Sequence, residues 1–362
     1  MEKTYSGVSI YTLCLLHEIF RQDTKNEYVL FYNSAKSVEL PKFHYPNVTI
    51  YHNKIPNKIF NLSLKLFKRP KLDELIGGTD IFFFPNINFF SVSKKCKVVT
   101  TIHDLSYERY PEFFSIKSRL WHALINPRAI CQISENLIAV SEHTKNELEN
   151  IYKIPKEKIT VIYSGVSQNS GADRNAKSIR EKYSLPDSYI LYLGNIDPRK
   201  NIEGVIDAFL HNNLPESCHL VITGYGAYER KWLHEAIQQS HGKIHSIGYV
   251  HESEKRALYS LAKIFLFPSF YEGFGFPPLE AMACGVPTVV SASSSLPEIV
   301  SDASILIDPY NSADIASAIK LLLENDALRN ALIEKGRERV KLFQWQDTAK
   351  AVIEIFSNCI KK

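Results

Sequence analysis

The chain has 362 residues, of which 45% are hydrophobic and 23% charged, and its formal net charge is +4. This composition excludes a disordered or collagen-like chain, and the length is enough for two domains with real cores. The mild charge argues against nucleic-acid binding, which needs a concentrated basic face. The six cysteines have no zinc or redox spacing. With no export signal recognised, we expect reduced thiols in the cytoplasm.

The first predicted element is a helix in the apolar run 8–16. A signal peptide is disfavoured, because the run is short, has no small-residue cleavage site and leads directly into His17 and Glu18. Helical spacing places Ile10, Leu13 and Leu16 on one face. Elsewhere no apolar run approaches the roughly 18 residues of a membrane span.

Short apolar runs then alternate with amphipathic segments along the whole chain. Strands are predicted at 28–32, 80–84, 97–102, 136–140 and 158–163, and again at 189–193, 219–223, 244–247, 264–267 and 287–290. Helices are predicted at 141–151, 201–210, 228–239, 252–262 and 278–283. Nearly continuous apolar strands are typical of parallel sheets covered on both faces. The alternation therefore predicts two doubly wound α/β domains.

A polar stretch at 167–178 without apolar period predicts the linker between these domains. The predicted division is an N-terminal domain 1–168, a C-terminal domain 169–344 and a terminal helix 345–362. In open α/β sheets, ligands bind beyond the carboxyl ends of the strands, so the cleft between the domains is the expected site.

The amino terminus departs from this plan. A doubly wound domain normally opens with a central strand that feeds its first glycine loop. Residues 1–6 are too short and too polar for such a strand. The sequence therefore predicts that the first domain lacks a middle strand, as if the chain were truncated or its start had been chosen too late.

The segment 194–201, with the sequence GNIDPRKN, follows a predicted strand and precedes a predicted helix. It places Arg199 and Lys200 together at the carboxyl end of that strand. An arginine fork and a lysine point charge suit a diphosphate. A solvated pair of cations at a helix start is the equally weighted alternative.

The segment 268–280, with the sequence PSFYEGFGFPPLE, connects a strand to a helix through Gly273 and Gly275. Glycines allow a ligand to approach the backbone, and helix-start amides bind anions. Glu272 and Glu280 are too far apart along a helix for a hydrolase pair. We expect each to bind hydroxyls on a different part of one extended ligand, although Glu280 alone would suggest an ordinary surface carboxylate.

Two weaker signals lie in the first half of the chain. His103 follows the apolar run 97–102 and precedes Asp104, at the end of a parallel strand where functional groups gather. A structural histidine is the more frequent reading of such a residue taken alone. Gly7, just ahead of the first helix, is a weak signal by itself.

Together these motifs resemble the GT-B, family 4 (group 1) retaining nucleotide-sugar glycosyltransferases, and most closely a bacterial mannosyltransferase-like branch that builds surface polysaccharides. The sequence EGFGFPPLE at 272–280 is the most specific part, and GNIDPRKN is the second. The patterns IHDL, YPEFF, VSEHTK and IYSGV follow in the family's order, so the resemblance covers nearly the whole chain.

The resemblance implies a GT-B fold with an interdomain cleft and a C-terminal helix that crosses back onto the first domain. It also implies a role for each motif residue. Arg199 and Lys200 would bind the donor diphosphate, Glu272 the donor-sugar hydroxyls, and Glu280 the ribose hydroxyls. The remaining donor-site residues would be Gly7 at the phosphates, His103 at the reacting sugar, Gly194, Gly273, Phe274, Gly275 and Phe276 around sugar and phosphate, and Gly224 and Tyr249 near the base.

The chain has no Asp-x-Asp triplet of the kind that holds a metal in many transferases. We therefore expect no cofactor and no metal, with the two cations and helix-start amides stabilising the leaving diphosphate. Retention by same-face return of the acceptor is implied by the resemblance alone. GDP-mannose is the favoured donor, ahead of UDP-sugars or dTDP-rhamnose, and a saccharide linked to polyprenyl diphosphate is the favoured acceptor class.

The segment 53–72 contains six Lys and Arg residues and no acid, with apolar residues at helical spacing. A basic amphipathic helix of this kind is typical of an interfacial membrane element, so we expect peripheral contact with the inner leaflet. The alternative is a helix whose apolar stripe Ile55, Ile59, Leu62 and Leu66 packs on the sheet while its lysines face water.

Two other functions remain open at this stage. A nucleotide-sugar 2-epimerase uses the same two-domain fold, although the EGFGFPPLE pattern argues against it. An inactive binding module is the third reading, because the first domain is predicted to lack a strand. Incubation with labelled donors distinguishes the three functions. Transfer or slow hydrolysis indicates the transferase, an epimerised sugar indicates the epimerase, and no reaction indicates the inactive module.

Overall fold

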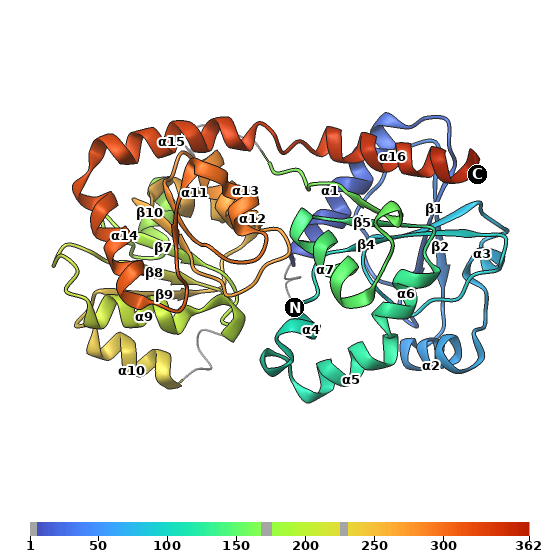
Figure 1. Ribbon diagram of the computed structural model, residues 1–362, viewed down its shortest axis with the longest axis horizontal. Coiled ribbons are helices and arrows are strands. Elements are labelled where there is room, and N and C mark those ends of the chain that lie inside the picture. Colours follow the sequence, from blue (N-terminus) through green and yellow to red (C-terminus); the bar gives the residue numbers. More distant parts are fainter. Residues whose placement is uncertain (1–5, 168–175, 225–230, 362) are drawn as a thin grey trace. The chain divides into compact units, whose positions relative to one another are not determined.

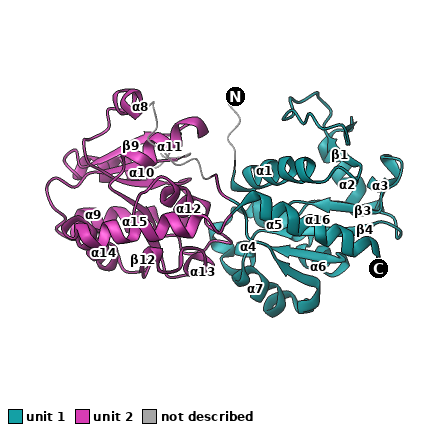
Figure 2. Ribbon diagram, turned by 90° about the horizontal axis from the view of Figure 1, so that it is seen from above, with its two compact units in different colours: residues 1–165, 344–362 teal, residues 166–343 magenta. Residues whose placement is uncertain are grey.

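A computed structural model describes residues 6–167, 176–224 and 231–361. The chain divides into two compact units (Figures 1 and 2), unit 1 with residues 1–165 and 344–362 and unit 2 with residues 166–343. This division lies within a few residues of the predicted domain boundaries. The predicted absence of a strand at 1–6 and most of the predicted linker at 167–178 fall outside the described residues.

Unit 2 contains one parallel sheet of six strands in the order β12-β11-β10-β7-β8-β9. The strands are β7 (Ile190–Leu193), β8 (Leu220–Thr223), β9 (Ile244–Gly248), β10 (Ile264–Phe267), β11 (Thr288–Ser291) and β12 (Ser304–Ile307). β7, β8, β10 and β11 are buried along their whole length. Burial of both faces explains why their sequences are continuous apolar runs.

The helices of unit 2 follow its strands in the expected alternation. They are α8 (Ala176–Lys182), α9 (Ile202–His211), α10 (Lys231–Gln239), α11 (Glu252–Leu261), α12 (Phe276–Ala283), α13 (Leu296–Val300), α14 (Ser312–Glu324) and α15 (Asp326–Val340). Apolar residues of α9, α10 and α14 pack with those of β7, β8 and β10 in one buried cluster. The sheet is thus held rigidly beneath the loops at its carboxyl edge.

Strand order reverses between β7 and β10. From β7 the chain proceeds outward through β8 and β9, and then returns to place β10, β11 and β12 on the other side. Loops that leave neighbouring strands in opposite directions open a crevice at such a switch point, and ligands of open α/β sheets bind there. The loops after β7 and β10 are the two segments that carry the predicted diphosphate and sugar residues.

Unit 1 is also built from parallel strands, but they form two separate sheets. β1 (Tyr28–Asn33) pairs with β2 (Val48–Asn53), and a second sheet has the order β3-β4-β5-β6. The strands of the second sheet are β3 (Ile81–Phe84), β4 (Lys97–Ile102), β5 (Asn136–Ala139) and β6 (Ile159–Val161). All five strands predicted for this half are present, and β2 was not predicted.

The helices of unit 1 are α1 (Gly7–Gln22), α2 (Asn57–Phe67), α3 (Leu72–Leu75), α4 (Ser106–Arg109), α5 (Ile116–Ile125), α6 (Pro127–Ile133), α7 (Glu142–Tyr152) and α16 (Trp345–Lys361). The terminal helix α16 belongs to unit 1 and packs against α1, as predicted. The segment after β6 also approaches the start of α16 closely at Gly165, where a Cβ would lie 2.3 Å from the backbone nitrogen of Trp345.

The face that helical spacing gives Ile10, Leu13 and Leu16 is not the buried face of α1. The buried residues of α1 are Tyr11, Leu15, Ile19 and Phe20. The hydroxyl of Tyr11 lies 3.1 Å from that of Thr101, a polar contact that apolar periodicity does not reveal.

The prediction of one continuous helix at 53–72 is wrong. It is divided into α2 and α3 because Lys68 has a left-handed backbone and Pro70 follows two residues later. None of the described helices combines the length and apolar character needed to span a bilayer.

Candidate functional site

The predicted cations Arg199 and Lys200 and the predicted Glu272 meet at the switch point of unit 2. A short 3-10 turn at Pro198–Lys200 follows β7, with the Asp197 carboxylate accepting a hydrogen bond from the Arg199 amide at 2.9 Å. Across the switch point, the Phe270 amide after β10 donates to the Arg199 carbonyl at 2.9 Å. The two loops are therefore fastened to each other by backbone before any side chain is considered.

Arg199 and Lys200 both pair with Glu272. Arg199 Nη1 lies 3.0 Å from Glu272 Oε2, and Lys200 Nζ contacts Glu272 Oε1. Arg199 Nη1 also donates to the Tyr271 carbonyl at 2.6 Å, and Lys200 Nζ lies 4.8 Å from the centroid of the Phe267 ring. All three charged side chains are largely withdrawn from solvent, so we name them the Glu272 triad.

The charge state of the triad follows from its geometry. Burial would raise the pKa of Glu272, but Arg199 and Lys200 outweigh it and lower that pKa to about 2. Burial lowers the pKa of Lys200, and Glu272 opposes the shift. With the Glu272 carboxylate ionised, two basic side chains share a single carboxylate, so the triad holds one more basic group than acidic groups. Such a preorganised cation pair can stabilise an anion without reorganisation.

A row of serines that the sequence analysis missed holds the loop of Glu272. The Ser294 hydroxyl accepts from the Glu272 amide at 2.8 Å, and the Ser295 hydroxyl donates to the Glu272 carbonyl at 2.9 Å and the Phe274 carbonyl at 3.1 Å. Ser293 similarly donates to the Phe270 carbonyl at 2.9 Å. The signal was the serine-rich sequence SASSS directly after a buried strand.

The helix start that follows is formed by Gly275, the N-cap of α12, whose backbone has a φ of 110°. A Cβ at this position would also lie 2.6 Å from Leu296 Cδ2, so only glycine fits without a shift. Pro277 and Pro278 carry no amide hydrogen, which removes two of the four donors of the first turn. The start of α12 therefore offers fewer anion-binding amides than the sequence predicted. An anion bound here would depend more on Arg199 and Lys200.

Glu280, on α12, has a different environment from Glu272. The buried Tyr259 of α11 donates a hydrogen bond from its hydroxyl to Glu280 Oε2 at 2.8 Å. Burial raises the pKa of Glu280, while the nearby ammonium of Lys255 lowers it and Glu252 raises it. Glu280 is not an ordinary surface carboxylate, since it is half-buried and held by a specific partner.

One predicted glycine, Gly224, also has a structural reason. Gly224 follows β8, and a Cβ there would lie 1.7 Å from the Gly194 carbonyl oxygen at the end of β7. Close approach of the two strand ends thus requires glycine at 224, whereas a Cβ at Gly194 would meet only ordinary contacts. Tyr249 lies directly after β9 and is partly exposed. All three lie at the carboxyl edge of the unit 2 sheet, with the triad and Gly273.

His103 lies in unit 1, at the carboxyl end of β4. Its Nε2 lies 2.8 Å from the Pro85 carbonyl oxygen, and its ring meets that of Tyr11 edge-on with centroids 4.8 Å apart. Burial lowers the pKa of His103, so the ring is neutral near pH 7. A neutral ring that donates through Nε2 has Nδ1 as an acceptor, which suits a hydroxyl better than an anion.

Gly7 is the first residue of α1 and is exposed. Ser6 caps this helix by accepting a hydrogen bond from the Ser9 amide at 3.2 Å, and no acidic residue lies in the first turn. The helix start therefore keeps its positive dipole end without a compensating carboxylate. The structure does not place Gly7 or His103 relative to unit 2, so their donor roles stay predictions.

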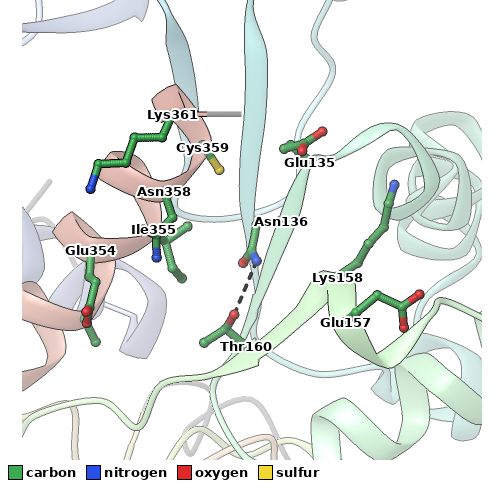
Figure 3. A pocket seen from close by; sticks show the side chains of 11 residues that line it. Glu135, Asn136, Glu157, Lys158, Thr160, Glu354, Ile355, Asn358, Cys359 and Lys361 are labelled. Atoms are coloured by element: carbon green, nitrogen blue, oxygen red, sulfur yellow. Dashed lines mark hydrogen bonds between the residues drawn. The ribbon is translucent and has the colours of Figure 1, made fainter.

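A cavity of about 700 Å³ lies at the opposite, amino-terminal edge of the unit 1 sheet. Figure 3 shows Asn136 of β5 and Thr160 of β6 in its wall, joined by a hydrogen bond of 3.3 Å. Lys158, Glu354 and Lys361 also line it. None of the predicted site residues is among its lining residues, so this hollow is not the predicted donor site.

Comparison with known proteins decides the family. The sequence of the "Glycosyltransferase Family 4" domain matches residues 5–169, and that of "Glycosyl transferases group 1" matches residues 174–339. The chain is 30% identical over 284 residues to the O-antigen chain mannosyltransferase B of Escherichia coli, covering 76% of this chain and 74% of that protein. The chain belongs to glycosyltransferase family 4.

Other family 4 relatives are longer. The serotype-specific mannosyltransferase WbdA of Escherichia coli is 30% identical over 282 residues, which are 73% of this chain but only 34% of WbdA. The chain therefore spans about a third of that relative.

Solved structures confirm the predicted GT-B fold, with two Rossmann-like units. Sucrose-phosphate synthase from Thermosynechococcus elongatus superposes with a TM-score of 0.74 at 21% identity, covering 98% of this chain and 93% of that one. WaaG, a glycosyltransferase involved in lipopolysaccharide biosynthesis, gives 0.70 at 14% identity, covering 98% and 96%. At these identities the likeness establishes the fold alone.

Proposed function

We propose that this family 4 glycosyltransferase transfers a hexose, mannose in the first place, from a nucleoside-diphosphate sugar to a saccharide acceptor. GDP-mannose is the favoured donor, and the acceptor is a lipid-linked saccharide in the synthesis of a bacterial surface polysaccharide such as O-antigen or capsule. The Glu272 triad at the switch point of unit 2 is the observation that carries the proposal. The names of the E. coli relatives support mannose and the O-antigen.

The triad fits the leaving group. Breaking the bond between the sugar C1 and the diphosphate oxygen leaves negative charge on the diphosphate, and we propose that Arg199 and Lys200, which are held together by Glu272, bind it. Their pairing with Glu272 fixes both side chains and still leaves one basic group more than acidic groups. Fixed cations perform the function that a divalent metal performs in many other transferases, so we propose that no metal is needed.

The remaining roles follow the family pattern, residue by residue. Glu272 binds hydroxyls of the transferred sugar, and Glu280 binds those of the ribose. His103, with its neutral ring, accepts a hydrogen bond from a donor-sugar hydroxyl. The acceptor oxygen forms its bond to C1 on the face that the diphosphate leaves, and a diphosphate oxygen takes the acceptor proton. The anomeric configuration is then retained.

The test uses the whole chain with GDP-mannose, UDP-glucose and dTDP-rhamnose, each with and without EDTA, and follows nucleotide release and sugar products by mass spectrometry. Transfer or slow hydrolysis of one donor, unaffected by EDTA, supports the proposal, and the anomeric coupling constant of the product tests retention. An epimerised nucleotide sugar would support the isomerase alternative. Binding without any reaction would indicate an inactive homologue.

A further inference from the structure

Two helices of unit 1 expose apolar side chains that their positions in the fold do not require. In α2 the buried residues are Phe60 and Leu64. Of the stripe for which packing on the sheet was the alternative, Ile59, Leu62 and Leu66 are each more than half exposed, as is the neighbouring Phe67. Ile55 alone of that stripe packs against the buried cluster. The helix therefore satisfies the core with one face and leaves a second apolar face unused.

Helix α5 repeats this arrangement. Only Ile125 is buried in it, and Ile116 is 84% exposed. The other exposed apolar residues of α5 are Leu120, Trp121 and Leu124. Their spacing puts them on one side of the helix. Globular proteins rarely expose apolar residues in groups of this size unless the surface binds something.

The two helices flank the same loop. Phe89, between β3 and β4, packs against the buried cluster that contains Phe60 and Leu64 of α2. The same Phe89 ring meets Trp121 of α5, with centroids 6.5 Å apart. Figure 1 shows α2 and α5 along one margin of unit 1. We call the exposed apolar residues of both helices, with the cations between them, the α2–α5 surface.

The charge of this region has one sign. The segments 53–72, 81–103 and 113–134, which contain α2, the Phe89 loop and α5, have no aspartate or glutamate. Their exposed cations on the two helices, the turn after α2 and the start of α6 are Lys58, Lys65, Lys68, Arg69, Lys117, Arg119 and Arg128. Apolar side chains surrounded by Lys and Arg, without acids, match an interface of anionic headgroups over acyl chains.

We propose that the α2–α5 surface docks unit 1 onto a bilayer that contains anionic phospholipid. Phe67, Leu66, Ile116 and Trp121 insert among the acyl chains, and the surrounding lysines and arginines bind headgroup phosphates. Docking in this way would bring the enzyme to a lipid-linked acceptor, but it does not depend on the transfer activity and is measured without donor.

The direct test is sedimentation of the protein with vesicles of phosphatidylcholine alone or mixed with phosphatidylglycerol, at low and high salt. Binding is expected only to the anionic vesicles and is expected to weaken with salt. Replacing Lys58, Lys65, Lys68 and Arg69 by Gln should reduce the partition coefficient about tenfold or more. Leu66→Ser with Phe67→Ser should reduce it by a similar factor, because apolar insertion is lost.

A matched control replaces two exposed apolar residues of unit 2, Leu321→Ser and Leu342→Ser, and should bind vesicles as the unchanged chain does. Thermal unfolding of every variant checks that unit 1 is intact. The proposal is overturned if the unchanged chain ignores anionic vesicles at low salt, if it binds neutral vesicles equally well, or if the α2 variants bind undiminished. Salt-sensitive binding to an acidic protein surface but not to vesicles would also overturn it.

A second inference comes independently from unit 2 and rests on the proposed function. Tyr259 is 1% exposed, so it cannot touch a ligand, and its hydroxyl donates to one oxygen of Glu280. Burial and the Glu280 charge raise the pKa of Tyr259, so the phenol stays a donor at every working pH. We infer that Tyr259 is a positioning residue, which holds Glu280 Oε2 and leaves Oε1 directed to the ribose hydroxyls.

The test compares the binding of GDP and UDP with that of their 2′,3′-dideoxy counterparts. The unchanged chain should prefer the ribose forms, and Tyr259→Phe should reduce that preference about fivefold to tenfold. Tyr189→Phe is the matched control, since Tyr189 is equally buried and donates to the Leu258 carbonyl at 2.7 Å. It should lower stability without changing the preference.

The double variant Tyr259→Phe, Glu280→Gln should lose no more preference than Glu280→Gln alone, because both act through one contact. If the unchanged chain shows the preference and Tyr259→Phe keeps it, the positioning role falls and the proposed function stands. If the unchanged chain binds ribose and dideoxy forms alike, the ribose role of Glu280 falls and the role of Tyr259 falls with it.

Discussion

Unit 2 and unit 1 use the same parallel architecture to different ends. Unit 2 closes all its strands into one sheet, and its polar groups at the carboxyl edge bond to one another, as Arg199 and Lys200 do with Glu272. Unit 1 divides its strands between two sheets and leaves the apolar faces of α2 and α5 in solvent. The difference is that unit 2 pairs its charged side chains with one another, whereas unit 1 keeps apolar side chains of two helices exposed.

The largest expected effect tests the rigid charges. Lys200→Ala should reduce kcat by about 10² to 10³, the cost of losing one preorganised donor at a leaving group, which is about 2.7–4 kcal/mol. Steady-state kinetics measures this. Lys231→Ala, which removes a fully exposed lysine of the same unit, should leave kcat unchanged. Equal effects of the two changes would contradict a local role for the triad.

The next largest effect is the pH dependence of stability, which should differ between Glu272 and Glu280. The pKa of Glu272 falls from 4.5 to about 2 on folding, so its contribution is present above pH 4.5 and is lost as pH falls towards 2. The pKa of Glu280 is raised, so its ionisation opposes folding as pH rises.

Urea unfolding of unit 2 at several pH values measures both terms. The stability lost in Glu272→Gln should grow with pH between 2 and 4.5, by up to about 3 kcal/mol. Glu280→Gln should gain stability relative to the unchanged chain as pH rises above 4.5. Parallel pH profiles for the two variants would show that the environments of Glu272 and Glu280 do not differ as described.

A smaller effect tests the close approach of the ends of β7 and β8 in unit 2. Gly224→Ala should destabilise unit 2 by about 1–3 kcal/mol, because the new Cβ would overlap the Gly194 carbonyl. Gly194→Ala is the control at the other strand end, where a Cβ finds ordinary contacts. Thermal unfolding should separate the two variants, and a Gly224→Ala protein as stable as Gly194→Ala would exclude the close approach.

The smallest effect concerns unit 1. His103→Ala should reduce kcat/KM up to about tenfold, the value of one neutral hydrogen bond. The reduction should be the same from pH 7 to 9, because burial keeps the ring neutral there. His52→Ala removes a ring with the same 2.8 Å contact to a backbone oxygen, that of Ser34, and should not alter kcat/KM. A pH-dependent loss would indicate that His103 acts as a proton donor.

The sequence predicted well where burial dictates the pattern. Every predicted strand is present, because strands covered on both faces read as continuous apolar runs. β2 was missed, since Val48–Asn53 is partly exposed and contains polar residues, and β12 was missed beside a serine-rich stretch. The spacing of Ile10, Leu13 and Leu16 did not reveal the buried face of α1, which includes Tyr11 with its polar contact to Thr101.

Site residues were predictable where the residue type is specific to its chemistry. They were not predictable where common residue types, such as serine, hold the site residues in place. Arg199, Lys200 and Glu272 were predicted to share one ligand, and the structure brings them together. The hydroxyls of Ser293, Ser294 and Ser295 were not found, because serines in a loop carry no pattern that tells which carbonyl they will bond. The role of Tyr259 was also not found, because an aromatic residue in a helix normally indicates a core position.

The hydrogen bonds from the serines at 291–295 to the Glu272 loop matter for any attempt to engineer the sugar specificity proposed for this site. The shape of the loop at 268–275 depends partly on another segment, residues 291–295 from the end of β11 to the start of α13. Hydroxyls of that segment donate to four carbonyl groups of the loop. A chimera that imports only the loop from a relative would leave those hydroxyls facing the wrong acceptors. Both segments form one exchangeable module and should be transplanted as a pair.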